Sequence, residues 1–299
     1  MTRAAAGRAE GYVDVGPGRV WYESAGEGPT LLMLHGGPGG SSEDFAPMMT
    51  LAEEGYRVVR YDQLGSWRSD KPDDASLWQF QRFVDEVETV RRALDLGRVH
   101  LLGQSWGSFL ALEYALQHQE NLKSLILGGG AASTAECVAG MDSLRRQLPA
   151  EAQDVLARCE AAGQTEDPEY LAAMTVLYKR HLCRLDPWPE ELTEALHHMG
   201  PAYQTMWGPN EFTCTGNLRG WDRTGRLGEI RVPTLITCGR YDEVVPSCSE
   251  TMRRGIPGAE LVVFEESAHM VHFEEPERYF AVLRDFLRRA ETGRAAKRS

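Results

Sequence analysis

Short apolar runs alternate with amphipathic stretches along most of this chain, and the alternation limits the folds that the chain can adopt. Runs typical of buried strands occupy residues 19–24, 30–36, 56–62, 99–105, 122–130, 234–242 and 259–267. Between them, residues 80–97 carry apolar side chains every three or four positions, at Phe80, Phe83, Val84, Val87, Val90 and Leu94. Two further helices are predicted over 108–119 and 276–290. Strands that alternate with helices form βαβ units, so the sequence predicts an α/β fold with a mostly parallel sheet and helices on both faces.

The alternation is interrupted between residues 132 and 224. There the pattern is helical, with Pro, Trp and Gly punctuation in "LDPWPEEL" and "MWGPNEF". We therefore predict a helical cap (132–224) inserted into an α/β core made of residues 1–131 and 225–299. Such a cap would cover the carboxyl ends of the strands, where open α/β sheets bind their ligands. The ends of the chain, 1–11 and 291–299, are small and polar, and we expect them to be frayed.

The charge and composition of the chain narrow the class of partner. Its 299 residues carry a formal net charge of −12, which disfavours sequence-independent binding to nucleic acid or to an anionic membrane surface. No run of about eighteen apolar residues is present, and the first residues lack the apolar core of a signal peptide, so we expect a cytoplasmic protein. The six cysteines have neither C-x-x-C nor zinc-site spacing, so we expect reduced thiols and no metal site.

The chemistry is indicated by "GQSWG", a G-x-S-x-G pattern formed by Gly103, Ser105 and Gly107. It directly follows a predicted strand and directly precedes a predicted helix. A serine on such a tight turn presents its hydroxyl at the edge of the sheet, and its neighbours must be small because strand and helix approach closely there. The alternative is an ordinary strand-to-helix turn. We predict that Ser105 is a nucleophile.

A serine nucleophile needs a base, and the base needs an acid that orients it. His269 lies between the last predicted strand and the last helix, so it falls at the carboxyl edge of the sheet. His272 is the local competitor, and a surface histidine is the alternative for His269. Asp242 ends the preceding strand and is the expected acid, although Glu243 is near enough that spacing alone does not choose between them. Five further histidines are expected at core edges or on helix surfaces: His100, His118, His181, His197 and His198.

Acyl transfer also needs two N–H groups that stabilise an oxyanion. The loop "HGGPGG" follows the strand "TLLML" and has little side-chain bulk. We predict that the N–H groups of Gly37 and Trp106 form the oxyanion hole. A glycine loop could instead hold a phosphate, but this one has neither a G-K-[ST] ending nor a GxGxxG pattern. No metal or organic cofactor is implied by these residues.

Taken together, these motifs resemble those of the proline iminopeptidase family of α/β-hydrolases, and the likeness covers nearly the whole chain. The matching pieces are "HGGPGG", "YDQLGSWRSDKP", "LLGQSWGS", "HLCRLDPWPEEL", "GPNEFTCTGNLRGWD", "PTLITCGRYDEVVP" and "SAH". The resemblance implies an α/β-hydrolase fold with a helical cap, and a nucleophile, acid and base at Ser105, Asp242 and His269. It also implies that Glu211 and Glu243 hold the free α-amino group of the substrate. For each glutamate the alternative is a structural acid, solvated in the cap or capping a nearby helix.

One piece departs from the family pattern and leaves the substrate open. Leu64 and Trp67 stand in "DQLGSWRS" where family members often have "DQRGSGRS", and Trp67 could narrow the pocket. The resemblance implies hydrolysis of a small peptide or of an aminoacyl amide, including an amide in a natural-product intermediate. Rival functions are a carboxylesterase that uses the same triad and a ligand-binding relative without turnover. Epoxide hydrolase and dehalogenase chemistry is disfavoured because related sites of those classes use an aspartate nucleophile.

Overall fold

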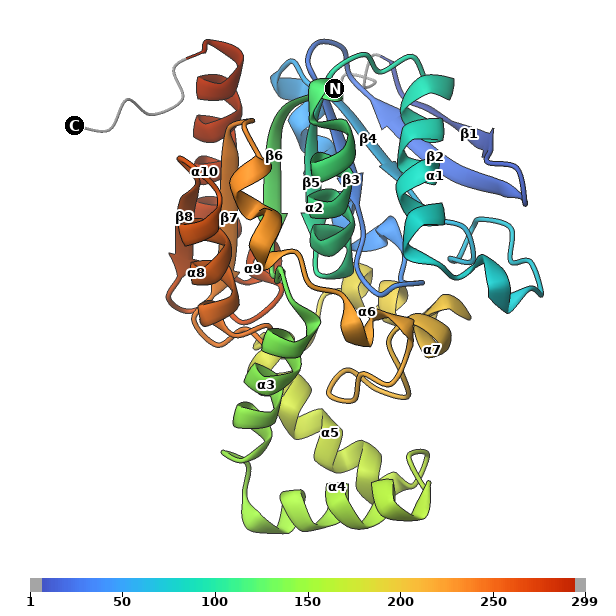
Figure 1. The fold of residues 1–299 in the computed structure, drawn as a ribbon, viewed down its shortest axis with the longest axis vertical. Helices are drawn as coiled ribbons and strands as arrows, with labels where there is room; N and C mark the ends of the chain where they lie inside the picture. The colour runs from blue at the N-terminus through green and yellow to red at the C-terminus, as the bar shows by residue number, and fades with distance from the viewer. Residues whose placement is uncertain (1–6, 294–299) are drawn as a thin grey trace.

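The computed structural model describes residues 7–293, which form an eight-stranded sheet flanked by helices (Figure 1). The strands are β1 (Ala9–Asp14), β2 (Arg19–Ala25), β3 (Thr30–Leu34), β4 (Arg57–Tyr61), β5 (Val99–Gln104), β6 (Leu122–Gly128), β7 (Thr234–Gly239) and β8 (Glu260–Phe264). Their order in the sheet is β1-β2-β4-β3-β5-β6-β7-β8. Strand β2 is antiparallel to both of its neighbours, and every other pair is parallel. The predicted α/β fold with a mostly parallel sheet is confirmed.

Strand β1 lies where we expected a frayed end, and for residues 9–11 that expectation is wrong. The strand pairs with β2 over its full length, from Ala9 opposite Ser24 to Asp14 opposite Arg19. Only Val13 is buried, so the strand has little of the apolar pattern by which strands are predicted. Residues 1–6 and 294–299, which include most of the two ends expected to fray, lie outside the described residues.

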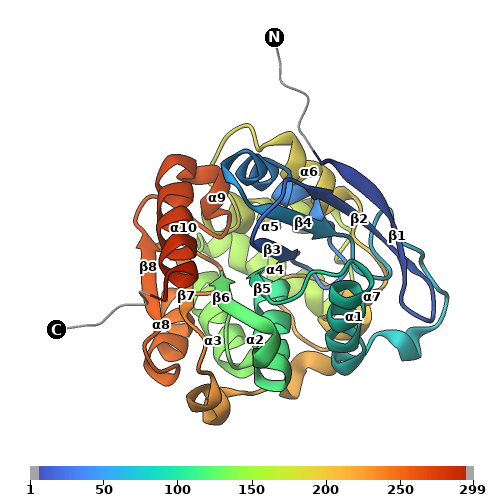
Figure 2. The ribbon, with the colours of Figure 1, turned by 90° about the horizontal axis from the view of Figure 1, so that it is seen from above.

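The inner strands are buried on both faces because helices cover the sheet from both sides. Leu31 and Met33 of β3 pack into one core cluster, and Leu32 and Leu34 pack into the other. This is why the run from Leu31 to Leu34 is apolar at every position instead of alternating. One face is covered by α1 (Phe80–Ala93), α2 (Trp106–His118) and α8 (Pro246–Gly255) (Figure 2). The other is covered by the 3-10 helix η1 (Ser42–Glu54), α9 (Val271–Glu274) and α10 (Pro276–Glu291).

The chain between β6 and β7 is helical and lies beyond the carboxyl ends of the strands (Figure 1). Its helices are α3 (Thr134–Arg145), α4 (Ala150–Ala162), α5 (Pro168–His181), α6 (Glu190–His197) and α7 (Ala202–Met206). Figure 1 shows α3, α4 and α5 extending away from the sheet, with α6 and α7 closer to it. We call residues 132–224 the cap segment, and its status as a separate domain stays a prediction. Within residues 7–293, no helix combines the length and the apolar character needed to cross a membrane.

The register of the parallel strands brings three loops to one edge of the sheet. Gln104 at the end of β5 is opposite Gly128 at the end of β6, and Gly128 is opposite Thr237 of β7. Gly239 at the end of β7 is opposite Phe264 at the end of β8. The segments that follow β5, β7 and β8 therefore leave the sheet side by side, although they are far apart in the sequence.

Candidate active site

Ser105 occupies the turn between β5 and α2. Its backbone φ of 57° lies in the left-handed region, which is unfavourable for a serine and typical of a nucleophile on a strand-to-helix turn. A Cβ atom on Gly103 would lie 2.0 Å from the carbonyl oxygen of Gly107, and a Cβ atom on Gly107 would lie 1.8 Å from that of Leu34. Only glycine fits at either position, so the G-x-S-x-G spacing is a packing requirement of this turn.

A buried hydrogen bond joins His269, in the loop after β8, to Asp242, in the loop after β7. Nδ1 of His269 lies 2.7 Å from Oδ1 of Asp242, and the two residues are 2% and 1% exposed. The same Oδ1 accepts the N–H of Val244 at 2.9 Å, which fixes the carboxylate in its loop. Burial alone would lower the pKa of His269, but the charges of Asp242, Glu243 and Glu211 raise it to about 10. Asp242 therefore orients the ring and favours its cationic form.

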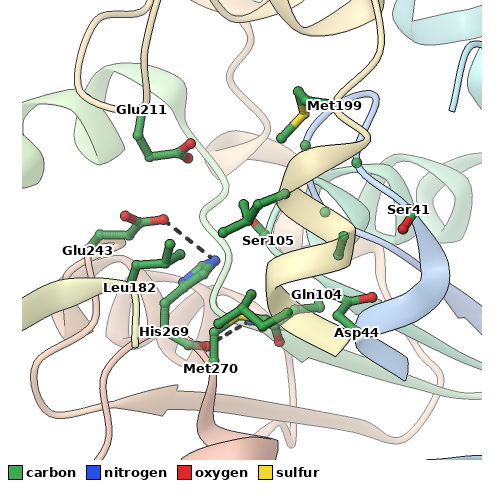
Figure 3. A pocket seen from close by; sticks show the side chains of 16 residues that line it. Ser41, Asp44, Gln104, Ser105, Leu182, Met199, Glu211, Glu243, His269 and Met270 are labelled. Atoms are coloured by element: carbon green, nitrogen blue, oxygen red, sulfur yellow. Dashed lines mark hydrogen bonds and ion pairs between the residues drawn. The ribbon is translucent and has the colours of Figure 1, made fainter. Parts of the chain in front are cut away.

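Ser105 and His269 line the same cavity (Figure 3). Nε2 of His269 has no hydrogen-bond partner among residues 7–293, and it lies 3.8 Å from Oε1 of Glu243. In enzymes without a bound substrate, the contact between nucleophile and base is often long and tightens only when substrate binds. An oriented histidine with a free Nε2 is what a serine at this position needs for activation.

His272, the competitor of His269, lies in the core instead of the cavity. Its Nε2 donates to the carbonyl oxygen of Asp44 at 3.1 Å, and its ring is next to those of Phe45, Phe273 and Tyr279. Burial lowers the pKa of His272 to about 4, so the ring is neutral near pH 7. The contacts of His272 therefore describe a structural residue.

The glycine loop after β3 lies against Ser105. A Cβ atom on Gly36 would come within 3.1 Å of the Cβ atom of Ser105, and Gly37 has a φ of 119°, which favours glycine. Gly37 also lines the cavity beside Ser105. The N–H of Trp106 is the first of helix α2, so it has no acceptor within that helix. The assignment of the Gly37 and Trp106 N–H groups to an oxyanion stays a prediction, and the position of the loop is compatible with it.

Glu211 and Glu243 both line the cavity that contains Ser105, one from the cap segment and one from the loop after β7 (Figure 3). Oε2 of Glu211 accepts the Tyr203 hydroxyl at 2.7 Å, whereas Oε2 of Glu243 is buried without a partner among residues 7–293. Burial raises the pKa of both carboxyl groups, and for Glu243 the neighbouring charge of Glu211 raises it further. The structure thus brings together two acids that are thirty-two positions apart in the sequence, 211 and 243.

His181 supports the site in a way that the sequence did not reveal. It ends α5, and its carbonyl oxygen accepts the N–H groups of Glu243 at 3.1 Å and of His269 at 3.2 Å. Its Nδ1 also lies 2.7 Å from the carbonyl oxygen of Tyr241. A residue of the cap segment therefore positions both loops that carry the acids and the base. Because the backbone carbonyl makes two of these contacts, no side-chain pattern could have predicted the role.

Gln63 and Gln104 are further supporting residues that sequence reasoning missed. The side chain of Gln63 donates to the carbonyl oxygen of His35 at 3.2 Å and accepts Nε1–H of Trp106 at 2.9 Å. It therefore links the start of the glycine loop to the start of α2. Gln104 donates to the carbonyl oxygen of His269 at 2.9 Å. In the sequence, these two residues could have been found only through the motifs that contain them: "DQLGS" for Gln63 and the serine motif for Gln104.

Trp67, the departure from the family pattern, is not among the described residues that line the cavity. Its ring stacks on that of His198, with the centroids 4.3 Å apart and the planes 7° apart. The guanidinium group of Arg68 lies 4.3 Å from the Trp67 ring centroid. Trp67 therefore contacts the residue that follows α6 of the cap segment, and it does not narrow the pocket directly.

Comparison with known proteins identifies the family of this chain. The family model described as the alpha/beta hydrolase fold matches residues 29–276, so the chain is an α/β-hydrolase. A proline iminopeptidase from Heyndrickxia coagulans is 41% identical over 283 residues, which are 93% of this chain and 98% of that protein. One from Saccharolobus solfataricus is 39% identical over 269 residues, which are 89% of this chain and 87% of that protein. The crystal structure of proline iminopeptidase from Mycobacterium smegmatis aligns with a TM-score of 0.89 at 35% identity, over 95% of this chain and 99% of that one. The chain belongs to the proline iminopeptidase family, and it is an enzyme of the hydrolase class.

Proposed function

We propose that this enzyme is a serine aminopeptidase that removes proline or another small N-terminal residue from a peptide or an aminoacyl amide. The observation that carries the proposal is the carboxylate pair of Glu211 and Glu243 in the cavity of Ser105. Neither lysine nor arginine is among the described residues that line this cavity. Apart from His269, whose Nε2 lies 3.8 Å from Oε1 of Glu243, these buried carboxylates have no cationic side chain beside them among the described residues of the cavity, so they form a site for a cation from outside. The α-ammonium group of a substrate fits this requirement because it lies close to the carbonyl that the serine attacks.

In the proposed reaction, Nε2 of His269 takes the hydroxyl proton of Ser105 as the oxygen attacks the first carbonyl carbon of the substrate. The N–H groups of Gly37 and Trp106 stabilise the tetrahedral oxyanion. His269 then gives the proton to the leaving nitrogen, and the C–N bond breaks to leave an acyl-enzyme. A water molecule, deprotonated by His269, attacks the ester. The bond between the acyl carbon and the Ser105 oxygen then breaks, His269 returns the proton to that oxygen, and the free amino acid leaves. Asp242 stabilises the imidazolium in both steps.

The same carboxylates connect substrate binding to the activation of His269. Glu211 and Glu243 contribute to the raised pKa of about 10, so without substrate the histidine is cationic at neutral pH and cannot act as a base. A bound ammonium group neutralises the two carboxylates and removes their effect on His269, whose pKa then falls. It also favours the ionised form of the glutamates, whose own pKa values are raised by burial. Either change releases a proton: from His269 where the glutamates are already ionised, or from a glutamic acid where one of them is protonated.

We therefore expect that binding of a protonated substrate amine releases about one proton per ligand near pH 7. The measurement is calorimetric titration of the Ser105→Ala variant with prolinamide, in two buffers of different ionisation enthalpy. The apparent binding enthalpy should differ between the buffers by the enthalpy of one buffer protonation. An enthalpy that is independent of the buffer would contradict the coupling. A variant with both Ser105→Ala and Glu211→Gln should release fewer protons per bound ligand than Ser105→Ala alone.

A second cavity at Ser105 supports a small first residue. It is lined mainly by apolar side chains of the core and of the cap segment, including Phe109, Met141 and Trp207. Glu211 lies at its border, as the pocket for the side chain next to the ammonium group requires. The space that the centre of a water molecule can occupy in it is about 10 Å³, which is room for roughly one water molecule. A proline or alanine side chain needs less displacement of these residues than leucine or phenylalanine does.

The proposed function is tested by hydrolysis of a panel of aminoacyl 2-naphthylamides. We expect the prolyl or alanyl substrate to exceed the leucyl and phenylalanyl substrates by at least about tenfold in kcat/KM, because a larger side chain must displace buried residues. Met141→Ala enlarges the pocket and should raise leucyl hydrolysis relative to prolyl hydrolysis. The absence of hydrolysis across the whole panel would reject the function, whereas a preference for phenylalanine would reject only the assignment of this pocket.

A further inference from the structure

A third acid, Asp44, lines the cavity of Ser105. Figure 3 shows Glu211 and Glu243 to one side of Ser105 and Asp44 to the other. Asp44 belongs to η1 and is only 5% exposed, and its Oδ1 is buried without a hydrogen-bond partner among residues 7–293. Most buried polar atoms in proteins have a partner, so an unpartnered carboxylate that borders a substrate cavity is available for contact with the substrate.

The position of Asp44 corresponds to the leaving-group side of the reaction. Two cavities meet at Ser105, and the leaving group must lie in the one that contacts His269, because that residue gives its proton to the leaving nitrogen. The cavity that contains Asp44 is bordered by His269 and Met270. The smaller cavity, which we assign to the first side chain, is bordered by neither.

The surroundings of Asp44 determine its charge. Burial raises its pKa to about 7, with Arg60 and His269 opposing the rise and Asp62 and Glu43 adding to it. At pH 8.5 the carboxyl group is therefore mainly ionised. Apolar side chains from α6 line the same cavity, which keeps the local dielectric constant low and makes interactions between charges strong.

We propose that Asp44 determines leaving-group specificity, because it repels leaving groups with a carboxylate close to the scissile bond and accepts neutral or cationic ones. In a dipeptide the terminal carboxylate is only two bonds from the leaving nitrogen, so it would lie in the region of Asp44. Dipeptides are then poor substrates, whereas dipeptide amides and aminoacyl amines are good ones. The inference rests on the proposed aminopeptidase function and adds the class of leaving group.

The test compares three substrates of the wild-type enzyme at pH 8.5: the dipeptide prolylglycine, its amide, and the prolyl amide of ethylenediamine in its monocationic leaving-group form. We expect kcat/KM for the amide to exceed that for the dipeptide by at least roughly tenfold, because like charges placed together in a desolvated site repel strongly. The cationic substrate should be at least as good as the amide. Asp44→Asn should reduce the difference between amide and dipeptide to about threefold or less.

Glu43→Gln is the matched control. It removes the same charge one position away. Glu43 pairs with Arg60 and Arg68 and is not among the described residues that line the cavity. The preference for the amide over the dipeptide should therefore persist in this variant. A preference that survives Asp44→Asn, or equal wild-type rates on all three substrates, would overturn the inference and leave the proposed function intact. If Asp44→Asn does not fold, the kcat/KM values of the wild-type enzyme for the three substrates decide. A dipeptide with a kcat/KM as high as that of the cationic substrate overturns the inference. No cleavage of any of the three would reject both.

Discussion

Replacing Ser105 with alanine should lower kcat for prolyl 2-naphthylamide by roughly 10⁴- to 10⁶-fold, because the chemistry depends on this oxygen and no other group can form the acyl-enzyme. The structure also indicates that binding should survive. The carboxylates that we propose to hold the amine belong to other segments, and the turn keeps Gly103 and Gly107. The measurement is steady-state kinetics combined with calorimetric titration of the variant with prolinamide.

The control for this substitution is Ser108, which lies in the first turn of the helix that follows Ser105. Ser108 is buried, and its hydroxyl group has no partner among residues 7–293. Ser108→Ala should therefore retain activity within about threefold, because removing an unpaired buried hydroxyl group costs little. A Ser105→Ala variant with wild-type activity would show that the serine is not the nucleophile. A fluorophosphonate probe that labels the wild-type enzyme but not this variant would give the same information through covalent chemistry.

Replacing Glu211 with glutamine should lower kcat/KM for prolyl 2-naphthylamide by roughly 30- to 5,000-fold. This range corresponds to the about 2 to 5 kcal/mol that is typically lost when one partner of a buried charge pair is removed. The loss has two sources: weaker binding of the ammonium group and a smaller change in the pKa of His269 on binding. Hydrolysis of an N-acetylprolyl ester, which has no cation, should not fall.

Glu190→Gln is the matched control for this charge. Glu190 is an exposed residue of α6 in the cap segment and is not among the described residues that line the cavity, so its substitution removes one negative charge from the surface. The kcat/KM of Glu190→Gln for prolyl 2-naphthylamide should stay within about twofold of the wild-type value, because exposed charges are screened by water and salt. If Glu211→Gln lowered the hydrolysis of the free-amine substrate and of the blocked ester by the same factor, the residue would have a structural role and not an amine-binding one.

Much of the fold could be predicted because burial imposes patterns that are visible in the sequence. Strands buried on both faces contain continuous apolar runs, as in "LLML" of β3, and the helices that cover them have regular apolar spacing. The positions of Ser105, Asp242 and His269 followed from the same reasoning, since each comes after a strand whose carboxyl end faces the same edge. Strand β1 escaped prediction because it is held mainly by backbone pairing and buries little apolar surface.

The orientation of individual side chains could not be predicted in the same way. Neighbouring side chains on an extended segment point in opposite directions, so the sequence could not decide whether Asp242 and Glu243 serve one site. In the structure the N–H of Val244 donates to the Asp242 carboxylate, and the N–H of Glu243 donates to the carbonyl oxygen of His181. The loop thereby directs Asp242 to His269 and Glu243 to the cavity, as one shared site requires. Trp67 and Asp44 illustrate the same limit. Trp67 stacks on His198 away from the cavity, and Asp44 enters the cavity from a helix without a recognised motif.

The central claim is that a carboxylate pair next to a serine nucleophile makes hydrolysis depend on a free N-terminal amine. The most direct test is the ratio of kcat/KM values of the wild-type enzyme for prolyl 2-naphthylamide and for its N-acetyl derivative, measured at one pH. We predict that the free amine is favoured by at least about a hundredfold, because the acetylated substrate leaves the buried pair without a cation. Equal rates on the two substrates would contradict the account and would identify Glu211 and Glu243 as structural acids.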